Sequence, residues 1–253
     1  MSGLRPPGSC VIMQPTFLPW LGYFALIDQA DIFVFLDDVQ FSKQSWQSRN
    51  RISGPNGPIL ISLPIARKPS KPLIRDVRLA DRFDLAGLVP HLESILGRAP
   101  YWGTVERLMR RVLAGPLLGL AELNIALIRA LAAEVGISAD FQRSSTLEVR
   151  SGDKAERLFD ICTLFGATTY LSPLGALDYL REGNTFSEYG TRLRFQGFQH
   201  PSYPQRRTGF QSHMSIIDAI AFVGPEETLR LIREGSRPPL TLDEALEAFG
   251  AAP

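Results

Sequence analysis

Short apolar runs and an amphipathic segment alternate near the start of the chain. Residues 10–14 (CVIMQ) and 31–36 (DIFVFL) are apolar, and residues 18–29 between them repeat apolar positions with helical spacing. This pattern predicts a strand, a helix and a second strand, joined as a βαβ unit. Pro19 fits the first turn of the helix, where its missing amide hydrogen would have no partner.

A hairpin and a helical segment are predicted next. Two β-prone runs, RNRI and ILISLPI, flank SGPNGP, whose Asn-Gly pair is a turn signal. Residues 73–79 (LIRDVRL) alternate like a half-exposed strand. Helical periodicity then predicts three helices, at 83–97, 101–114 and 117–135.

Strands and helices alternate again in the second half. FQRSSTLEV, TTYLS and RLRFQGF indicate strands, with helices predicted at 154–165 and 175–182. Further helices are expected to begin after Gly224 and at Thr241. The order predicts an α/β fold with a mostly parallel, Rossmann-like sheet flanked by helices, plus a β-hairpin and a helical insertion. We expect one domain over 1–253, divided into sheet-forming parts (10–80 and 137–225), the insertion (83–135) and C-terminal helices (225–253).

The polar run after residue 36 is the strongest candidate for chemistry. DDVQFSKQSWQSRNR follows the second predicted strand at its carboxyl end, where parallel α/β sheets bind ligands. Carboxylates accept hydrogen bonds from hydroxyls, arginines bind phosphate or carboxylate, and aromatic rings stack on flat apolar faces. The run therefore favours a polar, hydroxylated or phosphorylated ligand. The alternative is a solvated loop, in which Asp37 and Asp38 bind backbone donors or pair with Arg49 and Arg51.

Two histidines are candidates for a general base. His200 follows a predicted strand and His213 precedes a predicted helix, and histidine titrates near neutral pH. The alternative for each is a hydrogen-bonded structural or surface residue. Ser172 ends a predicted strand, where a serine is more often a cap than a nucleophile, and the GxSxG, GxGxxG and P-loop motifs are absent from the sequence.

The charge balance, the lengths of the apolar runs and the cysteine spacing argue against several classes of protein. The 27 basic and 26 acidic residues nearly cancel, which argues against a binder of nucleic acid. No apolar run approaches the roughly 20 residues that span a bilayer, and the polar first ten residues do not resemble a signal peptide. Cys10 and Cys162 form no metal-binding spacing. We therefore predict no metal, no cofactor, no membrane insertion and a cytoplasmic location.

Six segments together, in this order, resemble the WbqC-like protein family. They are IMQPTFLPWLGYF, ADIFVFLDDVQFSKQSWQSRNRI, ISLPI, PHLESILGRAPYW, DKAERLFDICTLFGATTYLSPLGALDYL and FQHPSYPQRRTGFQSHMSIIDAIAFVG. The chain departs from forms common in the family at Met13 (often HQP), Ser48 (often NRN) and Pro173 (often LSG). The first departure means that no histidine at that position could be catalytic in this chain.

The resemblance implies work on surface polysaccharides and supplies a set of matching polar positions. These are Gln14, Asp37, Asp38, Gln40, Lys43, Trp46, Arg49, Asn50, Arg51, His91, Ser172, His200, Tyr203, Gln205 and His213. We predict a transferase acting on an activated or carrier-bound (amino) sugar, by acyl or aminoacyl transfer, in O-antigen or surface-polysaccharide biosynthesis. The catalytic candidates are Asp37, Asp38 and His200, and all the others except His91 are candidates for ligand binding. The alternative is a non-catalytic sugar-nucleotide-binding or scaffold protein of a glycan-synthesis complex. The expected partner in either case is a small-molecule or carrier-bound sugar or acyl substrate.

Overall fold

The computed structural model describes residues 8–66, 71–80, 84–115, 119–149, 154–180, 190–206 and 209–249. The helix boundaries predicted at 83, 117 and 182 lie outside these ranges.

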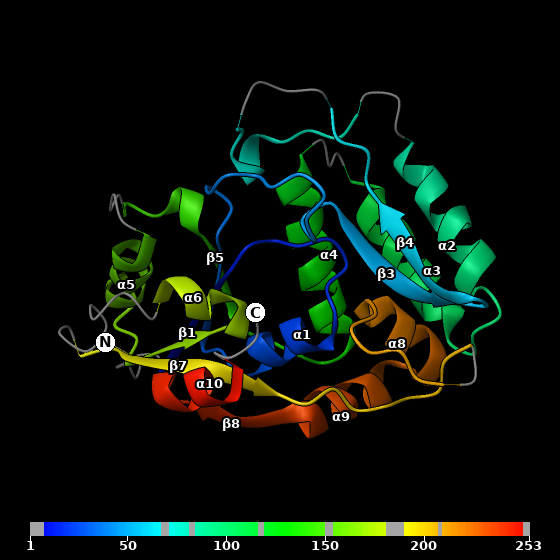
Figure 1. Ribbon diagram of the computed structural model, residues 1–253. Helices are drawn as coiled ribbons and strands as arrows, with labels where there is room; N and C mark the ends of the chain where they lie inside the picture. The colour runs from blue at the N-terminus through cyan, green and yellow to red at the C-terminus, as the bar shows by residue number, and fades with distance from the viewer. Residues whose placement is uncertain are drawn as a thin grey trace, which may run out of the picture.

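Six strands of the described chain form one twisted sheet (Figure 1). They are β1 (Ser9–Met13), β2 (Ile32–Phe35), β5 (Asp140–Arg143), β6 (Thr169–Ser172), β7 (Arg192–Phe198) and β8 (Ser236–Leu240), placed in the order β5-β2-β1-β6-β7-β8. All neighbours are parallel except β7 and β8. Numbered among themselves along the chain, these strands follow the Rossmann order 3-2-1-4-5-6. The predicted sheet is confirmed, and its order reverses between β1 and β6.

The sheet is buried on both faces, as parallel sheets usually are. In β2, Phe33 and Phe35 enter one hydrophobic cluster, whereas Ile32 and Val34 enter the other. The first cluster is covered by α1 (Leu21–Asp28), α4 (Leu120–Glu134), α8 (Ile216–Val223) and α9 (Pro225–Gly235). The second is covered by α5 (Lys154–Leu164), α6 (Leu177–Leu180) and α10 (Leu242–Phe249).

The hairpin and the first two helices of the insertion lie on the right of Figure 1. β3 (Arg49–Gly54) and β4 (Gly57–Ser62) pair antiparallel across a two-residue turn and are separate from the main sheet. The insertion contains α2 (Leu88–Leu96), α3 (Trp102–Leu113) and α4, and a short 3₁₀ turn (Leu85–Gly87) precedes α2. These helices confirm the predicted helical insertion.

The predicted strand at 73–79 is wrong. Ile74–Asp76 form one turn of 3₁₀ helix, and the flanking Leu73 and Leu79 each make a single bridge, to Gln40 and Ile65. Ile74 and Val77 are both fully buried. Buried positions three residues apart suit a tight helical turn, in which side chains at this spacing lie above one another.

Candidate functional site

The loop that follows β1 at the switch point is held in a strained conformation. Asn50 on β3 donates through Nδ2 to the carbonyl oxygens of Phe17 (3.0 Å) and Leu18 (2.8 Å). Gln47 Nε2 donates to Gln14 Oε1 (2.7 Å). Leu18 has a φ of 44°, a left-handed conformation that costs a leucine energy. Such strain persists only where neighbouring bonds enforce it, and it is concentrated at functional sites.

A second buried side-chain amide, from α4, binds the same loop. Asn124 on α4 donates through Nδ2 to the carbonyl oxygens of Pro15 (3.0 Å) and Gln47 (2.8 Å). The amide of Phe17 donates to the carbonyl of Trp46 (2.9 Å). The loop after β1 and the segment that leads into β3 are therefore one rigid unit.

Trp20, at the end of this loop, is the centre of an aromatic group that we call the Trp20 cluster. Its members are Trp20, Phe198, His200, Tyr203, Phe210 and His213. The ring centroids of Trp20 and His213 lie 4.5 Å apart, and the rings of Trp20 and His200 are nearly parallel with centroids 5.9 Å apart. A β-carbon at Gly22 would lie 2.2 Å from the indole ring, so only glycine lets Trp20 lie against the first turn of α1. The cluster joins the loop after β1 to the loop after β7.

The His200 imidazole uses one of its two nitrogens in a hydrogen bond to a described residue. Its Nδ1 lies 2.8 Å from the carbonyl oxygen of Pro201, which can only accept a hydrogen bond, so Nδ1 carries the proton. Its Nε2 is buried and has no hydrogen-bond partner among the described residues. Burial lowers the pKa of His200 below 6.5. Nε2 is therefore a proton acceptor that no described residue occupies.

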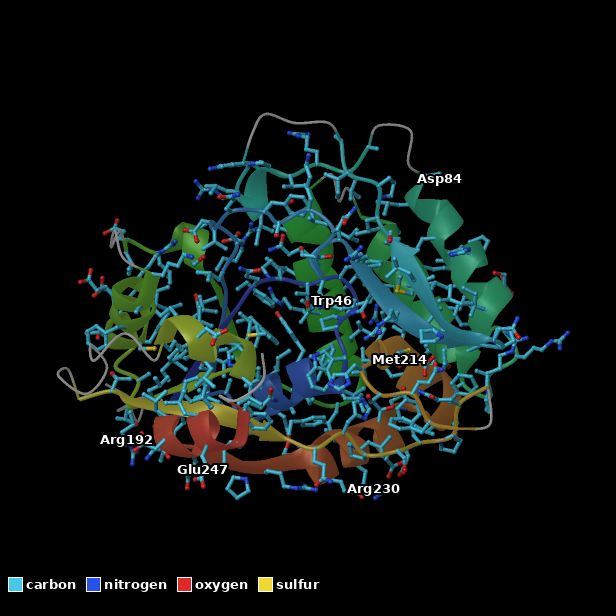
Figure 2. The ribbon with its side chains drawn as sticks, in the orientation of Figure 1. Trp46, Asp84, Arg192, Met214, Arg230 and Glu247 are labelled. Atoms are coloured by element: carbon cyan, nitrogen blue, oxygen red, sulfur yellow. The ribbon has the colours of Figure 1, made fainter. Side chains whose placement is uncertain are left out.

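Arg51 lies next to the Trp20 cluster, beside an exposed indole. The guanidinium of Arg51 lies over the ring of Trp46, 5.3 Å from its centroid, and Trp46 is 48% exposed. Burial and then the charge of Arg51 lower the pKa of His213. The Nε atoms of Arg49 and Arg51 are buried without a partner in the described chain. In Figure 2, Trp46 lies near the centre of the view, with Met214, which follows His213, below it.

Asp37 occupies a different cluster, at the end of β2. Its side chain is fully buried. Arg143, at the end of β5, donates to Asp37 Oδ2 through Nε (2.9 Å) and Nη2 (2.6 Å). Ser145 donates through its amide (3.0 Å) to Oδ1 and its hydroxyl (2.9 Å) to Oδ2. Both carboxylate oxygens are therefore occupied, and they join the ends of β2 and β5.

Asp38 is paired in the same neighbourhood. It accepts from the hydroxyl of Ser144 (2.5 Å) and forms an ion pair with Arg157 on α5. The cations that pair with the two aspartates are thus Arg143 and Arg157, not the Arg49 and Arg51 considered from the sequence. β1 and β6 separate β2 from β7, so the aspartates stand three strand spacings, roughly 14 Å, from the strand that leads to His200. The structure does not bring the three catalytic candidates together.

Comparison with known proteins places the chain in a family. The model of the WbqC-like protein family matches residues 14–230. The chain belongs to the WbqC-like family. A protein of Mycobacterium tuberculosis named "Uncharacterized protein Rv1507c" is 32% identical over 229 residues, which cover 88% of this chain and 98% of that protein. No solved structure matches the chain. The matched region of this WbqC-like protein includes both clusters.

The other candidates of the WbqC-like chain are dispersed around the two clusters. Tyr203 and Gln205 contact Asp218 beside the Trp20 cluster. Ser172, fully buried at the end of β6, donates to the carbonyl of Pro173 (3.2 Å). The candidates Gln40 and Lys43 are exposed, as is His91, which was not a candidate.

Sequence reasoning missed several residues of the site. They are Trp20, Asn124, Arg143, Ser144, Ser145, Arg157, Phe210 and Asp218. Two of them had a sequence signal: Asn124 and Asp218 are polar residues within otherwise apolar helical runs. The others became relevant only through contacts between distant segments.

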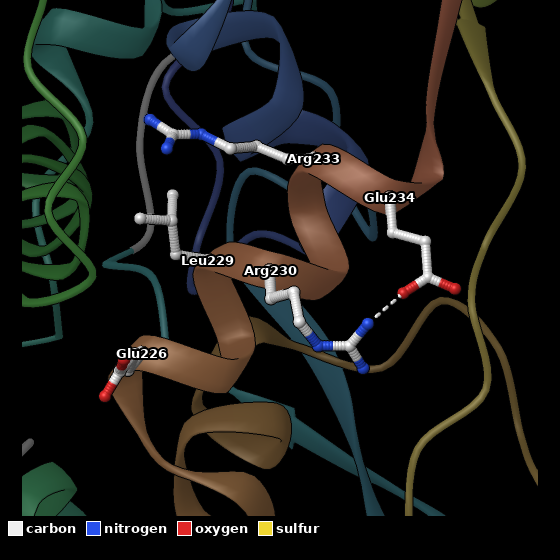
Figure 3. A pocket seen from close by; sticks show the side chains of 5 residues that line it. All are labelled: Glu226, Leu229, Arg230, Arg233 and Glu234. Carbon is white, nitrogen blue, oxygen red and sulfur yellow. Dashed lines mark hydrogen bonds and ion pairs between the residues drawn. The ribbon is translucent and has the colours of Figure 1, made fainter.

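A surface hollow on α9 lies outside both clusters. Figure 3 shows the five side chains that line it, namely Glu226, Leu229, Arg230, Arg233 and Glu234. Arg230 pairs with Glu234, and Arg233 pairs with Asp28 on α1. Because both arginines are already paired, we assign the hollow no ligand.

The described ranges contain neither a metal-binding group of side chains nor a membrane-spanning helix. No group of three or more His, Cys, Asp or Glu side chains there is arranged to hold a metal ion. Nor does that part of the chain contain a helix of the length and apolarity needed to cross a membrane.

The histidines of the Trp20 cluster should make stability depend on pH. The folded-state pKa values of His200 and His213 lie below 6.5, so the unfolded chain binds their protons first as pH falls. The free energy of unfolding should therefore decrease as pH falls below about 6.5, by at most about 1.4 kcal/mol per unit for each histidine. Because His213 is exposed, His200 should contribute most.

Urea unfolding at pH 7.5, 6.5 and 5.5 measures this dependence. His200→Gln should make the free energy of unfolding depend less on pH than in the unchanged chain. Groups other than His200 titrate in both proteins, so their contribution cancels in the difference between the two slopes. His91→Gln, on the exposed face of α2, is the matched control and should leave the slope intact. Equal slopes in all three proteins would contradict the prediction.

Proposed function

We propose that this protein is a transferase that acts on an activated or carrier-bound (amino) sugar, by acyl or aminoacyl transfer, in O-antigen or surface-polysaccharide biosynthesis. The observation that supports the proposal most is His200, whose buried Nε2 has no partner within the described chain. It belongs to a cluster built on the loop that leaves the switch point of a Rossmann-like sheet, where such folds bind ligands.

The proposed chemistry uses His200 as the general base. An acceptor amine or hydroxyl gives its proton to Nε2 while its nitrogen or oxygen bonds to the acyl carbon. The bond from that carbon to the carrier breaks, and the leaving group takes the proton. Burial lowers the pKa of His200, which favours the neutral imidazole that can accept a proton at pH 7.

Arg51, next to the cluster, and Arg49, two residues before it on β3, suit the anionic part of such a substrate. Guanidinium groups bind phosphate with paired hydrogen bonds, and those of Arg49 and Arg51 each have an unused Nε in the described chain. The exposed ring of Trp46 offers a flat face to a sugar or a nucleotide base. In this proposal Asp37 and Asp38 hold strand ends, because their oxygens are already bound to Arg143 and Arg157.

A second candidate is a non-catalytic protein that binds a sugar nucleotide in a glycan-synthesis complex. The placement of the aspartates favours it, because both serve in ion pairs and leave only the histidines of the Trp20 cluster as base candidates. The exposed ring of Trp46 with the guanidinium of Arg51 over it is sufficient for binding without chemistry.

Replacing the arginines tests the anion site. Arg49→Lys and Arg51→Lys should each weaken binding, because lysine lacks the planar fork of donors. Thermal shift with UDP-N-acetylglucosamine and with acetyl coenzyme A measures the effect, since a ligand at 100 times its dissociation constant adds about 2.7 kcal/mol to stability.

Arg111→Lys is the matched control, because this arginine is exposed on α3. Identical shifts in all four proteins would remove Arg49 and Arg51 from the site. A shift in the unchanged chain without any transfer product, across a panel of amine and hydroxyl acceptors, would favour the non-catalytic candidate.

A further inference from the structure

The carboxylate of Asp218 is buried in contact with the Trp20 cluster, through the hydroxyl of Tyr203. Asp218 is in the first turn of α8, and Ser215 is the N-cap of that helix. Its side chain is fully buried, and burial raises its pKa. The neighbouring residues of the helix, IIDAIAFV, are apolar. A carboxylate at such a position costs folding energy unless several donors surround it.

Each oxygen of Asp218 serves a different part of the site. Oδ1 accepts from the amide (2.7 Å) and the hydroxyl (2.5 Å) of Ser53 on β3. Oδ2 accepts from the hydroxyl of Tyr203 (2.9 Å) and from Gln205 Nε2 (3.3 Å), both in the loop after β7. The hairpin and the loop are therefore bound to the same carboxylate.

These donors lie close in sequence to the groups of the proposed site. Ser53 follows Arg51 by two residues on β3, so the two side chains share a face of the strand. Tyr203 follows His200 by three residues, and their rings are nearly parallel with centroids 6.3 Å apart. A shift of either donor would move the arginine or the imidazole with it.

We propose that Asp218 is a positioning residue that holds the strand of Arg51 and the loop of His200 in a fixed relation. This inference rests on the proposed function, which assigns the two parts to one site. Asparagine cannot replace the carboxylate, because its NH₂ group would face a donor either at Ser53 or at Gln205. Asp218→Asn therefore releases one of the two parts while nearly preserving side-chain volume.

The accessibility of His200 Nε2 to diethyl pyrocarbonate measures this positioning without any substrate. Asp218→Asn and Tyr203→Phe should speed modification of His200 by about fivefold to tenfold, as expected when a bond that closes a local opening is lost. Mass spectrometry reports His200 and the exposed His91 in the same molecule, and the His91 rate should not change. The controls make the same chemical changes at exposed positions, Asp243→Asn and Tyr101→Phe.

An unchanged His200 rate in Tyr203→Phe, a variant that loses one oxygen and should fold, would overturn the proposal. So would equal acceleration at His91, which indicates general loosening. The second role of Asp218, holding the strand of Arg51, is tested by the binding of inorganic pyrophosphate. Calorimetry should show weaker binding in Asp218→Asn. If the unchanged chain does not bind pyrophosphate, the proposed anion site fails, while the His200 rates still decide the role of Asp218.

Discussion

Replacement of Asp37 by alanine is expected to lower the free energy of unfolding by about 3 kcal/mol. The change removes the acceptor for two bonds from Arg143 and two from Ser145 and leaves the amide of Ser145 without its acceptor. Losing one partner of a buried pair typically costs about 3 to 5 kcal/mol. The side chain of Arg143 is one-third exposed, so water compensates in part and the loss falls at the lower end.

Urea denaturation with an unchanged m-value would measure this loss. The matched control is Asp28→Ala, which removes a carboxylate that also accepts two bonds from one arginine, Arg233, at the surface. Its effect should be much smaller, because solvent screens the pair. If instead Asp37→Asn kept its melting temperature and lost activity, Asp37 would be the catalytic group first expected from the sequence.

Replacement of His200 by glutamine should reduce turnover by about 10² to 10⁴ while leaving substrate affinity within about threefold. Glutamine is similar in size and can still form hydrogen bonds, but it cannot accept a proton from the acceptor at neutral pH. The assay uses the donor and acceptor that the thermal-shift screen identifies, and it separates kcat from KM.

The same assay is applied to two further variants, His91→Gln as a control and His213→Gln as a comparison. His91 is exposed on α2, so its variant should match the unchanged chain. His213 lies beside Arg51, so its variant should change KM more than kcat. Full turnover by His200→Gln would exclude the base role and leave the binding protein as the better proposal.

The sequence predicted the elements whose periodicity matches their burial. β1, α1 and β2 were predicted correctly because the two strands are buried on both faces and therefore form continuous apolar runs. The turn of the hairpin was found through Asn56 and Gly57. β8 was missed, because Pro238 and Pro239 in SRPPL break the pattern of a strand. Its pairing depends on its position beside β7, which local sequence does not encode.

The candidate site could be predicted only in part, for a related reason. Trp46, Arg51, His200 and His213 were selected by residue type and by position after or before predicted elements, and the structure brings them together. Asp37 was selected on the same grounds but lies in another cluster. Its partner Arg143 is separated from it by 106 residues, so their pairing follows from the strand order rather than from local sequence.

The edges of the sheet bear on how copies of the chain can associate. Pro238 and Pro239 on β8 have no amide hydrogens, so this border offers fewer donors to an incoming strand. The opposite border is β5, which has only four residues and carries Asp140 and Arg143. Both features discourage strand addition. At high protein concentration, self-association by sheet extension should therefore be disfavoured, and any stable oligomer should use helical or hairpin surfaces.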